Sequence, residues 1–286
     1  MIPVIDFKSP NVLEKIRKAY TTVGFAVFTN TLQNKDQTTM NVWFDLMKEF
    51  FKQDLEKKNE YKYQAENNLG YTVMGAENVD PNAPKDMKES FNYNNSRMPS
   101  ELWPTLNGFK ATALQTIDIA DRLTLKILEK FDEILDTGSL LTKAHIKPYN
   151  TTRVIHYPAY DGPLEHKQMR IGEHSDYGTI TLLWQINDVP GLQVQDLQKT
   201  WHPVPYANDG VVVNIGDLLQ RWTNDYFVST KHRVVNSHIH TPRYSMAHFV
   251  DPEPGTIVQN LSKIKLDQYK PIESRQYLMN RLAQSY

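Results

Sequence analysis

Apolar residues recur every three or four positions in several long stretches of the chain. The pattern covers residues 11–22, 36–52 and 107–135, and a further helix is expected over residues 272–286. This spacing lines up one face of a helix, so each stretch is predicted to be an amphipathic helix, the third unusually long. The Thr137-Gly138-Ser139 run is expected to end the long helix, because glycine readily adopts the conformation found where helices stop. The packing residues expected in the last helix are Leu278, Leu282 and Tyr286.

From about residue 150 the pattern changes to short β-branched runs separated by Gly, Pro, Asn or Asp. These runs are TRVIHY, GTITLLW, GLQVQD, GVVVNIG, HRVVN and YSMAHFV. Closely spaced short strands with turn signals between them are typical of a sandwich, a barrel or a jelly roll. Two earlier runs, PVIDF and GFAVFTN, also predict strands, whereas residues 67–99 predict loops with short strands.

This order of elements predicts an α+β protein with a double-sheet core and helices packed on it. Residues 1–105 are expected to form an N-terminal region, and residues 106–286 the long helix and the β-rich core. No Pro-, Gly- or Ser-rich linker separates the two parts, so we expect one structural unit.

The composition narrows the classes of function. Lys and Arg total 32 and Asp and Glu total 33, for a net charge of -1, and no basic run indicates nucleic-acid binding. The absence of cysteine excludes disulfides, thiolate metal sites and a cysteine nucleophile. No secretory signal and no apolar stretch of membrane-spanning length is visible. We therefore expect a soluble cytoplasmic protein with no nucleic-acid or membrane partner. No pattern indicates its oligomeric state.

The candidate chemistry starts at His174 and Asp176. On an extended segment these residues face the same way, so an imidazole and a carboxylate can reach one point. A second imidazole, His232, follows 58 positions later at the start of a β-prone run. Two histidines and one carboxylate form a facial triad that leaves three octahedral positions open, as Fe(II) oxygenases require. A structural imidazole–carboxylate pair, or zinc in place of iron, is the alternative.

A second pair of residues strengthens the prediction of a metal site. Arg243 and Ser245 follow His232 and share one face of a predicted strand. A guanidinium group and a hydroxyl suit a carboxylate, through a bidentate ion pair and one further hydrogen bond. A metal triad followed by a carboxylate-binding pair favours a chelating dicarboxylic acid as the ligand. A surface salt bridge is the alternative for Arg243.

Several motifs in a fixed order resemble those of the isopenicillin N synthase-like branch of the Fe(II)/2-oxoglutarate-dependent dioxygenases. They are IPVIDF, GFAVFTN, LWP, HYP, GEHSDYGTITLL, PGLQVQD, VVVNIGDLLQRWTN, STKHRVVN and RYSMAHFVDP, followed by the C-terminal helix. The resemblance covers nearly the whole chain. It implies a double-stranded β-helix, or jelly-roll, core with flanking helices.

The resemblance also implies roles for individual residues. His174, Asp176 and His232 would bind Fe(II), and Arg243 and Ser245 would bind the distal carboxylate of 2-oxoglutarate. The cosubstrate-binding strand of plant members reads Asn-Tyr-Tyr-Pro, and Tyr157 matches its second tyrosine. Ile155 and His156 replace the asparagine and the first tyrosine. The implied reaction uses O2, releases succinate and CO2, and most often hydroxylates the substrate. Ascorbate is expected to help in vitro.

Three functions stay open at this point. The first is a 2-oxoglutarate-dependent oxygenase of a small metabolite. The second is a non-haem iron oxidase of the same fold that does not use 2-oxoglutarate, as isopenicillin N synthase and ethylene-forming oxidases do with a similar Arg-x-Ser pair. The third is a non-catalytic metal-binding jelly-roll protein.

The remaining conspicuous side chains have structural interpretations. His248, Trp184 and Trp222 are expected to pack in the interior, and His166 is expected in an exposed loop. The His238-x-His240 pair would share one face of a strand, with a structural role. Arg153 would either contact an anionic substrate or form an ion pair.

Overall fold

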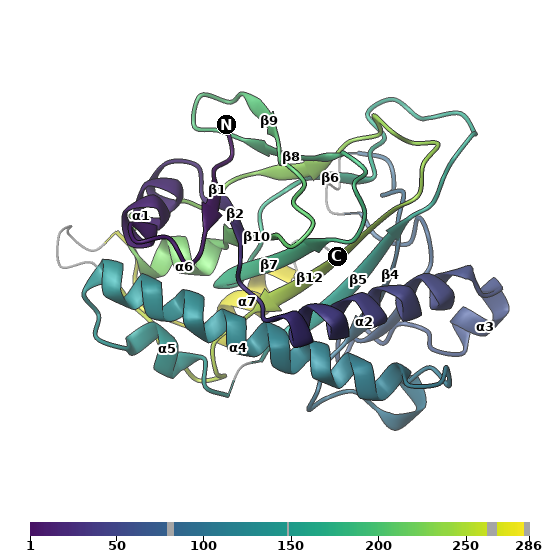
Figure 1. Ribbon diagram of the computed structural model, residues 1–286, viewed down its shortest axis with the longest axis horizontal. Coiled ribbons are helices and arrows are strands. Elements are labelled where there is room, and N and C mark those ends of the chain that lie inside the picture. The colour runs from purple at the N-terminus through teal and green to yellow at the C-terminus, as the bar shows by residue number, and fades with distance from the viewer. Residues whose placement is uncertain (79–82, 148, 262–267, 283–286) are drawn as a thin grey trace.

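Two β-sheets enclose an apolar interior, and long helices cover the other face of the larger sheet (Figure 1). This architecture comes from a computed structural model that describes residues 1–78, 83–147, 149–261 and 268–282. The larger sheet has eight strands in the order β1-β2-β10-β7-β12-β5-β4-β3, and the smaller has four in the order β6-β11-β8-β9. This double-sheet arrangement agrees with the predicted jelly roll.

The strands of the larger sheet are β1 (Val4–Asp6), β2 (Phe25–Thr29), β3 (Gly70–Thr72), β4 (Glu89–Tyr93), β5 (Thr151–Tyr157), β7 (Ile180–Gln185), β10 (Val211–Ile215) and β12 (Arg243–Val250). Those of the smaller sheet are β6 (Ile171–His174), β8 (Leu192–Gln195), β9 (Trp201–Pro203) and β11 (His232–Val234). A separate two-stranded antiparallel sheet pairs β13 (Ile257–Val258) with β14 (Ile272–Glu273). All the strand runs recognised in the sequence are therefore present.

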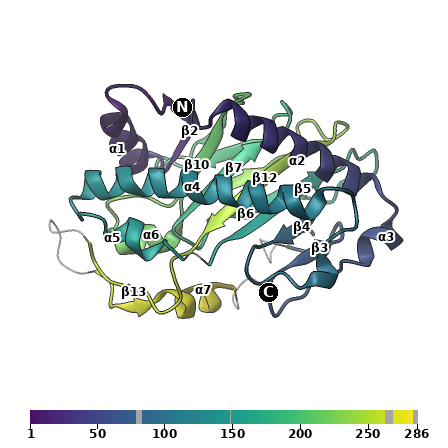
Figure 2. The ribbon, with the colours of Figure 1, turned by 60° about the horizontal axis from the view of Figure 1, so that its bottom comes forward.

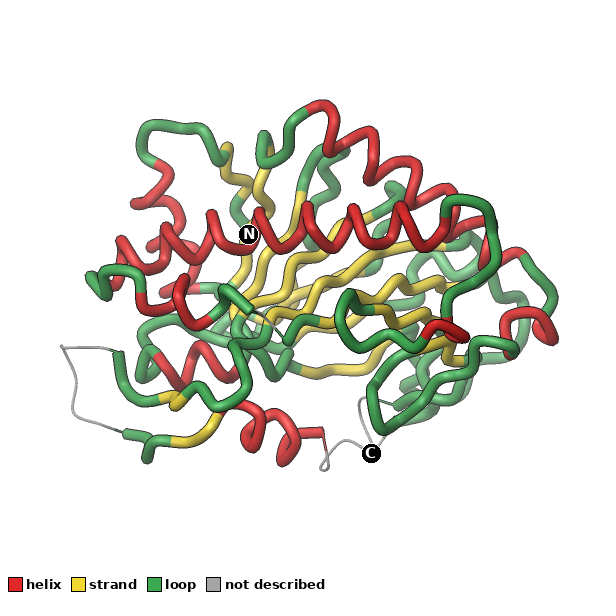
Figure 3. The backbone as a smooth tube through the Cα atoms, turned by 90° about the horizontal axis from the view of Figure 1, so that it is seen from below, coloured by secondary structure: helices red, strands yellow, loops and turns green. Residues whose placement is uncertain are grey.

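The helices are α1 (Val12–Thr22), α2 (Asn34–Lys52), α3 (Leu55–Asn59), α4 (Phe109–Leu135), α5 (Leu140–Ala144), α6 (Asp217–Trp222) and α7 (Ser274–Leu282), with a 3-10 turn, η1, at Ser100–Leu102. The long helix α4 runs across the large sheet beside α2, as Figures 2 and 3 show. Helices α3, α5 and α6 were not predicted, because five or six residues are too few to show a helical period.

The ends of α4 follow from local backbone geometry. The predicted start at residue 107 is early, because Gly108 has a φ of 76°, which an α-helix does not accommodate. Asp136 is also left-handed, with a φ of 54°, and its N–H donates to Asp132 O. The helix therefore stops just before the Thr137-Gly138-Ser139 run, as predicted.

The C-terminal helix is shorter than predicted. It begins at Ser274, after the short strand β14 takes up the start of the predicted range. Leu278 is half-buried, whereas Tyr286 lies outside the described residues and the packing of Leu282 is not described. No helix in the described ranges is long and apolar enough to cross a membrane.

Alternation along the strands divides the apolar side chains between two clusters. On β2, Ala26 and Phe28 belong to the cluster that joins the large sheet to the helices, and Phe25 and Val27 belong to a cluster between the sheets. The second cluster is smaller and combines residues from both sheets, including Tyr157. The space between the sheets is therefore only partly filled by apolar side chains, and the candidate site lies there.

Candidate metal centre

Two antiparallel strands place the two predicted histidine ligands opposite each other. His174 ends β6, His232 begins β11, and the register of these strands pairs them directly. Asp176 follows β6 by two residues. The Nε2 atoms of His174 and His232 lie 3.9 and 3.7 Å from Asp176 Oδ1. One ligand atom from each residue lies within 4.8 Å of the others, a spacing at which a single ion can contact all three.

Backbone carbonyl groups orient both imidazole rings. His174 Nδ1 lies 2.9 Å from Gly172 O, and His232 Nδ1 lies 3.2 Å from Thr230 O. A proton on each Nδ1 can be donated to these carbonyls, which leaves the lone pair of each Nε2 free to bind a metal. Burial, aided by the neighbouring His232 ring, lowers the pKa of His174 to about 4. The His174 ring is therefore neutral at pH 7, the form that binds a metal.

The carboxylate of Asp176 is held through one of its two oxygens. Thr181 Oγ1 donates to Asp176 Oδ2 at 2.6 Å, and Asn214 Nδ2 donates to the same oxygen at 2.8 Å. Burial raises the pKa of Asp176, but the two imidazole rings and these two donors outweigh burial and keep the pKa below its ordinary value. Asp176 is therefore ionised at neutral pH, with Oδ1 turned toward the histidines.

A cavity of about 70 Å³ lies between the two sheets and reaches all three candidate ligands; we call it the inner cavity. Tyr157 on β5 and Arg243 on β12 line it and are direct partners in the sheet register. The Arg243 guanidinium group lies 5.0 Å from the centre of the Tyr157 ring, and Nη1 donates to Ser245 Oγ at 3.4 Å. Most of the remaining wall is apolar and includes Phe25, Ile155, Ile171, Leu183, Leu192, Val212, Val234 and Ala247.

The inner cavity has the properties of an anion-binding site because of Arg243. This residue is 1% exposed, and its Nε and Nη2 atoms have no hydrogen-bond partner within the described ranges. Burying a guanidinium group without a counter-charge is costly, so a bound carboxylate would satisfy both the charge and the unpaired N–H groups. The donor set beside it, two imidazoles and one carboxylate, fits Fe(II) with open coordination positions. The residues present therefore fit both groups that the resemblance implies.

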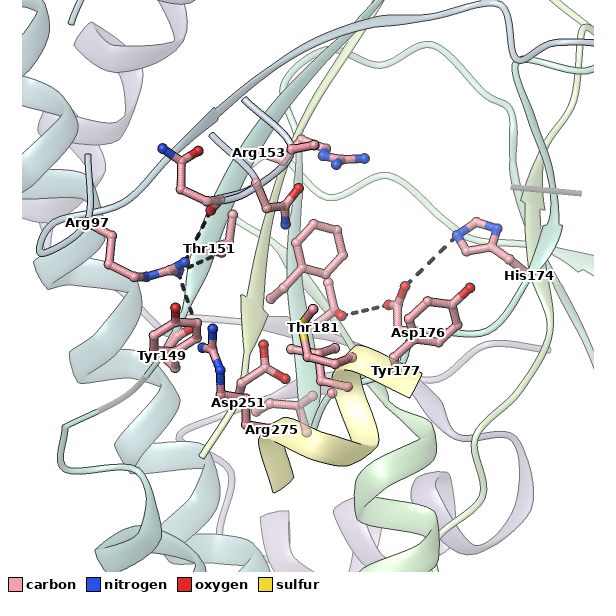
Figure 4. A pocket seen from close by; sticks show the side chains of 18 of the residues that line it. Arg97, Tyr149, Thr151, Arg153, His174, Asp176, Tyr177, Thr181, Asp251 and Arg275 are labelled. Carbon is pink, nitrogen blue, oxygen red and sulfur yellow. Dashed lines mark hydrogen bonds and ion pairs between the residues drawn. The ribbon is translucent and has the colours of Figure 1, made fainter. Parts of the chain in front are cut away.

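A larger cavity of about 230 Å³ also reaches His174 and Asp176; we call it the outer cavity. Its wall combines residues 65–68, parts of β5 and β12, the 174–181 segment and one side of α7. Figure 4 shows His174 and Asp176 at one end of this cavity and Arg97, Tyr149 and Arg275 at the other. A molecule in the outer cavity can therefore reach the metal ligands.

Arg153 lies on the wall of both cavities. Its Nε donates to Asn92 Oδ1 at 2.7 Å, and its Nη1 lies 3.2 Å from Glu77 Oε2. The ion pair considered for this residue is therefore present, and contact with a substrate stays a prediction.

The neighbours of Tyr157 that depart from the plant motif have separate roles. Ile155 lines the inner cavity. His156 does not, and its Nδ1 lies 2.7 Å from Glu89 Oε1 while its ring stacks on Tyr244 at 4.4 Å. With Ile155 in place of an asparagine, the polar side chains that β5 and β12 contribute to the inner cavity are those of Arg153, Tyr157 and Arg243.

The other predicted side chains mostly lie where they were expected. His248, Trp184 and Trp222 are buried, and His166 is exposed. The prediction for His238 and His240 was wrong, because both lie in an exposed turn rather than on a strand. His240 Nδ1 there lies 2.7 Å from Asp161 Oδ1.

Sequence patterns did not single out several residues that shape the site. Thr181 and Asn214 orient Asp176, although Asn214 interrupts the apolar run GVVVNIG and could have been noticed for that reason. Lys88 lines the inner cavity and pairs with Glu77. No local sequence motif marks Arg97, Tyr149 or Arg275 as part of a site.

Comparisons with known proteins bear on this geometry. Residues 149–252 match the 2OG-Fe(II) oxygenase superfamily, and residues 2–108 match the N-terminal region described as non-haem dioxygenase in morphine synthesis. The proline hydroxylase buaE of Petromyces alliaceus is 30% identical over 302 aligned positions, which cover 96% of this chain and 93% of that protein.

A similar solved structure is that of a full-length Neurospora crassa protein crystallised with alpha-KG. This complex has a TM-score of 0.88 and 31% identity, and the alignment covers 100% of this chain and 96% of that chain. The complex of the same protein with alpha-KG and thymine has a TM-score of 0.86 at 31% identity, covering 100% of this chain and 97% of that chain.

Proposed function

Because this chain belongs to the 2OG-Fe(II) oxygenase superfamily and is a non-haem Fe(II)- and 2-oxoglutarate-dependent dioxygenase of small molecules, we propose that His174, Asp176 and His232 bind its iron. The support is the convergence of two imidazole Nε2 atoms and one carboxylate oxygen on a single point. In the described residues, no other group of three such side chains is spaced to share one ion.

The inner cavity is the proposed site of 2-oxoglutarate. Arg243 would form the ion pair with the distal carboxylate, and Tyr157 and Ser245 flank its guanidinium group. The observation that carries this proposal is the buried, unpaired charge of Arg243 at one side of a cavity that also reaches the three metal ligands. The apolar walls exclude water and so strengthen the ion pair.

The residues of the chain have three tasks in the proposed reaction. When iron, 2-oxoglutarate and O2 are bound, they supply an oxidation in which 2-oxoglutarate becomes succinate and CO2 and one oxygen atom enters a substrate C–H bond. The carbonyls of Gly172 and Thr230 keep both imidazole Nε2 atoms free of protons. Thr181 and Asn214 hold one oxygen of Asp176 and leave the other for the metal. Arg243 sets the orientation of the cosubstrate.

The relatives also help to choose among the functions left open by the sequence. The Neurospora crassa protein was solved with alpha-KG, and with thymine in addition. The Petromyces alliaceus protein is named for the hydroxylation of proline. We therefore favour hydroxylation of a small molecule over the two alternatives, a 2-oxoglutarate-independent oxidase and a non-catalytic metal-binding protein.

The direct test is binding followed by turnover. Metal-free protein should bind Fe(II) without oxygen, and the complex should then bind 2-oxoglutarate with a new visible charge-transfer absorption. Admission of O2, with ascorbate present, should give succinate that rises when a true substrate is added. If Fe(II) binds but 2-oxoglutarate produces no absorption change and no succinate forms, the cosubstrate assignment is wrong.

A further inference from the structure

The outer cavity has a cationic end that lies away from the metal ligands (Figure 4). Arg97 comes from the segment after β4, Tyr149 precedes β5, and Arg275 lies in the first turn of α7. The guanidinium carbon of Arg97 lies 3.7 Å from the centre of the Tyr149 ring, and that of Arg275 lies 4.7 Å from it. Three segments far apart in the sequence therefore bring two positive charges to one aromatic ring.

The charge of Arg97 is held in place by neutral acceptors. Its guanidinium group donates to Asn67 O at 3.3 Å, to Asn150 O at 3.1 Å and to Thr151 Oγ1 at 3.1 Å. Among the described residues, no ion pair joins a carboxylate to the guanidinium group of Arg97 or Arg275, although the backbone N–H of Arg275 donates to Glu273 Oε1 at 2.9 Å. These contacts fix the position of the Arg97 guanidinium but leave its charge, and that of Arg275, without a carboxylate partner in this part of the chain.

The acidic groups around the outer cavity do not cancel these charges. Burial raises the pKa of Asp251 to about 7, so this neighbour carries only part of its charge at neutral pH. Glu66 lies on the wall but is exposed to solvent, and Asp176 belongs to the metal site. Burial pushes the pKa of Tyr149 upward, but a hydrogen bond from Arg275 and the charge of Arg97 bring it below its ordinary value. The lowered pKa of Tyr149 is a consequence of the same two positive charges.

Part of the wall of the outer cavity is apolar. Ile180, Phe249, Leu278 and Met279 line the same cavity as the two arginines and the candidate metal ligands. A ligand that spans the cavity would therefore have a charged group at one end and a hydrocarbon or aromatic body toward the other. The volume of about 230 Å³ is at the small end for a ligand site.

We propose that the substrate of this enzyme is a small organic carboxylate whose acid group binds to Arg97 and Arg275. This inference rests on the proposed function, because it places the body of the same molecule beside the metal. The forked guanidinium groups match a carboxylate, and the apolar side chains of the cavity wall would contact the part of the molecule that is oxidised. Arg97 and Arg275 are then specificity-determining residues.

Side-chain contacts connect helix α7 to the segment that carries Asp176, and these contacts fix the position of Arg275 relative to the metal site. Arg281 Nη2 lies 2.7 Å from Asp217 Oδ2, and its guanidinium group lies 4.6 Å from the centre of the Tyr177 ring. Ser175 Oγ also donates to Asp217, at 2.9 Å. The helix that carries one anion-binding arginine is thus connected to the segment that carries Asp176, so the distance between acid group and metal is set by the fold.

Matched pairs of acids and amides test this inference. The protein, loaded with Fe(II) without oxygen, is saturated with 2-oxoglutarate so that Arg243 is not available to the probes. Benzoate, phenylacetate, 4-phenylbutanoate and hexanoate are then compared with their primary amides by calorimetry and by the change in the charge-transfer absorption. At least one acid should bind about 10- to 100-fold more tightly than its amide, the range expected for charge-assisted hydrogen bonds.

Three variants sharpen the test. Arg275→Gln should remove most of the preference for the acid while leaving binding of the amide unchanged, and Arg275→Lys should keep part of the preference. Arg97→Gln should act in the same direction, although it also removes hydrogen bonds to the backbone. Arg122→Gln, which removes an exposed arginine paired with Asp36 and Asp118 on the helical side, is the matched control and should change nothing.

Two outcomes would overturn the inference. One is that no acid in the panel binds better than its amide, or that Arg275→Gln leaves the preference intact. The other is that thymine, a neutral ring, binds more tightly than every acid and is insensitive to both arginine variants. Failure of the proposed function itself is a different result, because 2-oxoglutarate would then not bind to the Fe(II)-loaded protein before any probe is added.

Discussion

The inner and outer cavities are built differently, although both are lined by Arg153, His174, Asp176, Thr181 and Phe249. Nearly all of the inner wall comes from strands of the two sheets, where register decides which side chains meet. Much of the outer wall comes from irregular segments and from α7. The residues proposed to bind iron and 2-oxoglutarate, which are needed with every substrate, therefore lie mostly on the sheets. The residues proposed to recognise one particular substrate lie mostly on segments that can vary without disturbing the sheets.

The two cavities also differ in how their arginines are held. Arg243 is fully buried and has two nitrogen atoms without partners among the described residues, so its environment suits one kind of ligand. Arg97 is half-buried, and Arg275 is exposed. We therefore expect changes in the inner cavity to affect catalysis with any substrate, and changes in the outer cavity to affect the choice of substrate. Four predictions test this contrast, from the largest expected effect to the smallest.

Asp176→Ala should abolish turnover, because it removes the anionic ligand of the candidate metal site. Iron affinity should fall by more than the ~10- to 100-fold that loss of an outer hydrogen-bond partner costs. Equilibrium binding of Fe(II) without oxygen and succinate release measure the two effects. Asp196→Ala is the matched control, since Asp196 also pairs with a histidine, His202 at 2.6 Å, but lies outside both cavities. Near-normal turnover in Asp176→Ala would contradict the triad assignment.

Arg243→Gln should raise the concentration of 2-oxoglutarate needed for half-maximal binding roughly 100-fold, as expected from the loss of two charge-assisted hydrogen bonds. Binding of Fe(II) should stay unchanged, because Arg243 does not contact the ligands. Titration of the charge-transfer absorption measures both quantities. Arg233→Gln, an arginine of β11 that contacts Glu173 and the Trp201 ring outside the cavities, is the control. An unchanged 2-oxoglutarate requirement in Arg243→Gln would place the cosubstrate elsewhere.

Thr181→Val and Asn214→Ala should each weaken iron binding by about 10-fold or more, because each removes a donor that orients Asp176. The 2-oxoglutarate requirement of the iron-loaded variants should change far less than in Arg243→Gln. Dissociation constants for Fe(II), measured with a competing chelator, separate these effects. Wild-type iron affinity in both variants would mean that Asp176 does not depend on these contacts.

Asp251→Asn should change the pH dependence of stability in the metal-free protein. Burial raises the pKa of Asp251 from 3.8 to about 7, so the folded state keeps a proton that the unfolded state releases. The wild type therefore loses stability as the pH rises between about 4 and 7, by at most ~1.4 kcal/mol per pH unit from this group. The variant lacks this loss, so its stability relative to the wild type should increase over that range and level off above it. Urea denaturation at pH 4.5, 6 and 8 measures the difference, and a constant difference would refute the assignment.

Periodicity predicted the secondary structure well where it extends over many residues. The apolar stripes predicted α1, α2 and α4, and alternation correctly placed Arg243 and Ser245 on one face of β12. The His238-x-His240 pair shows the weakness of the same argument, because alternation has no meaning in a turn. The short helices were missed because a single turn or two leaves no period to detect.

What the sequence determined by itself was the direction in which each functional side chain points on its own element. Local sterics impose that direction, since a strand alternates sides and a helix repeats every three or four residues. Which elements become neighbours was decided only in the tertiary structure, by strand pairing and packing. The register of β6 with β11 sets His232 opposite His174 across 58 residues of chain. The meeting of Arg97, Tyr149 and Arg275 depends on three segments whose proximity no local pattern encodes.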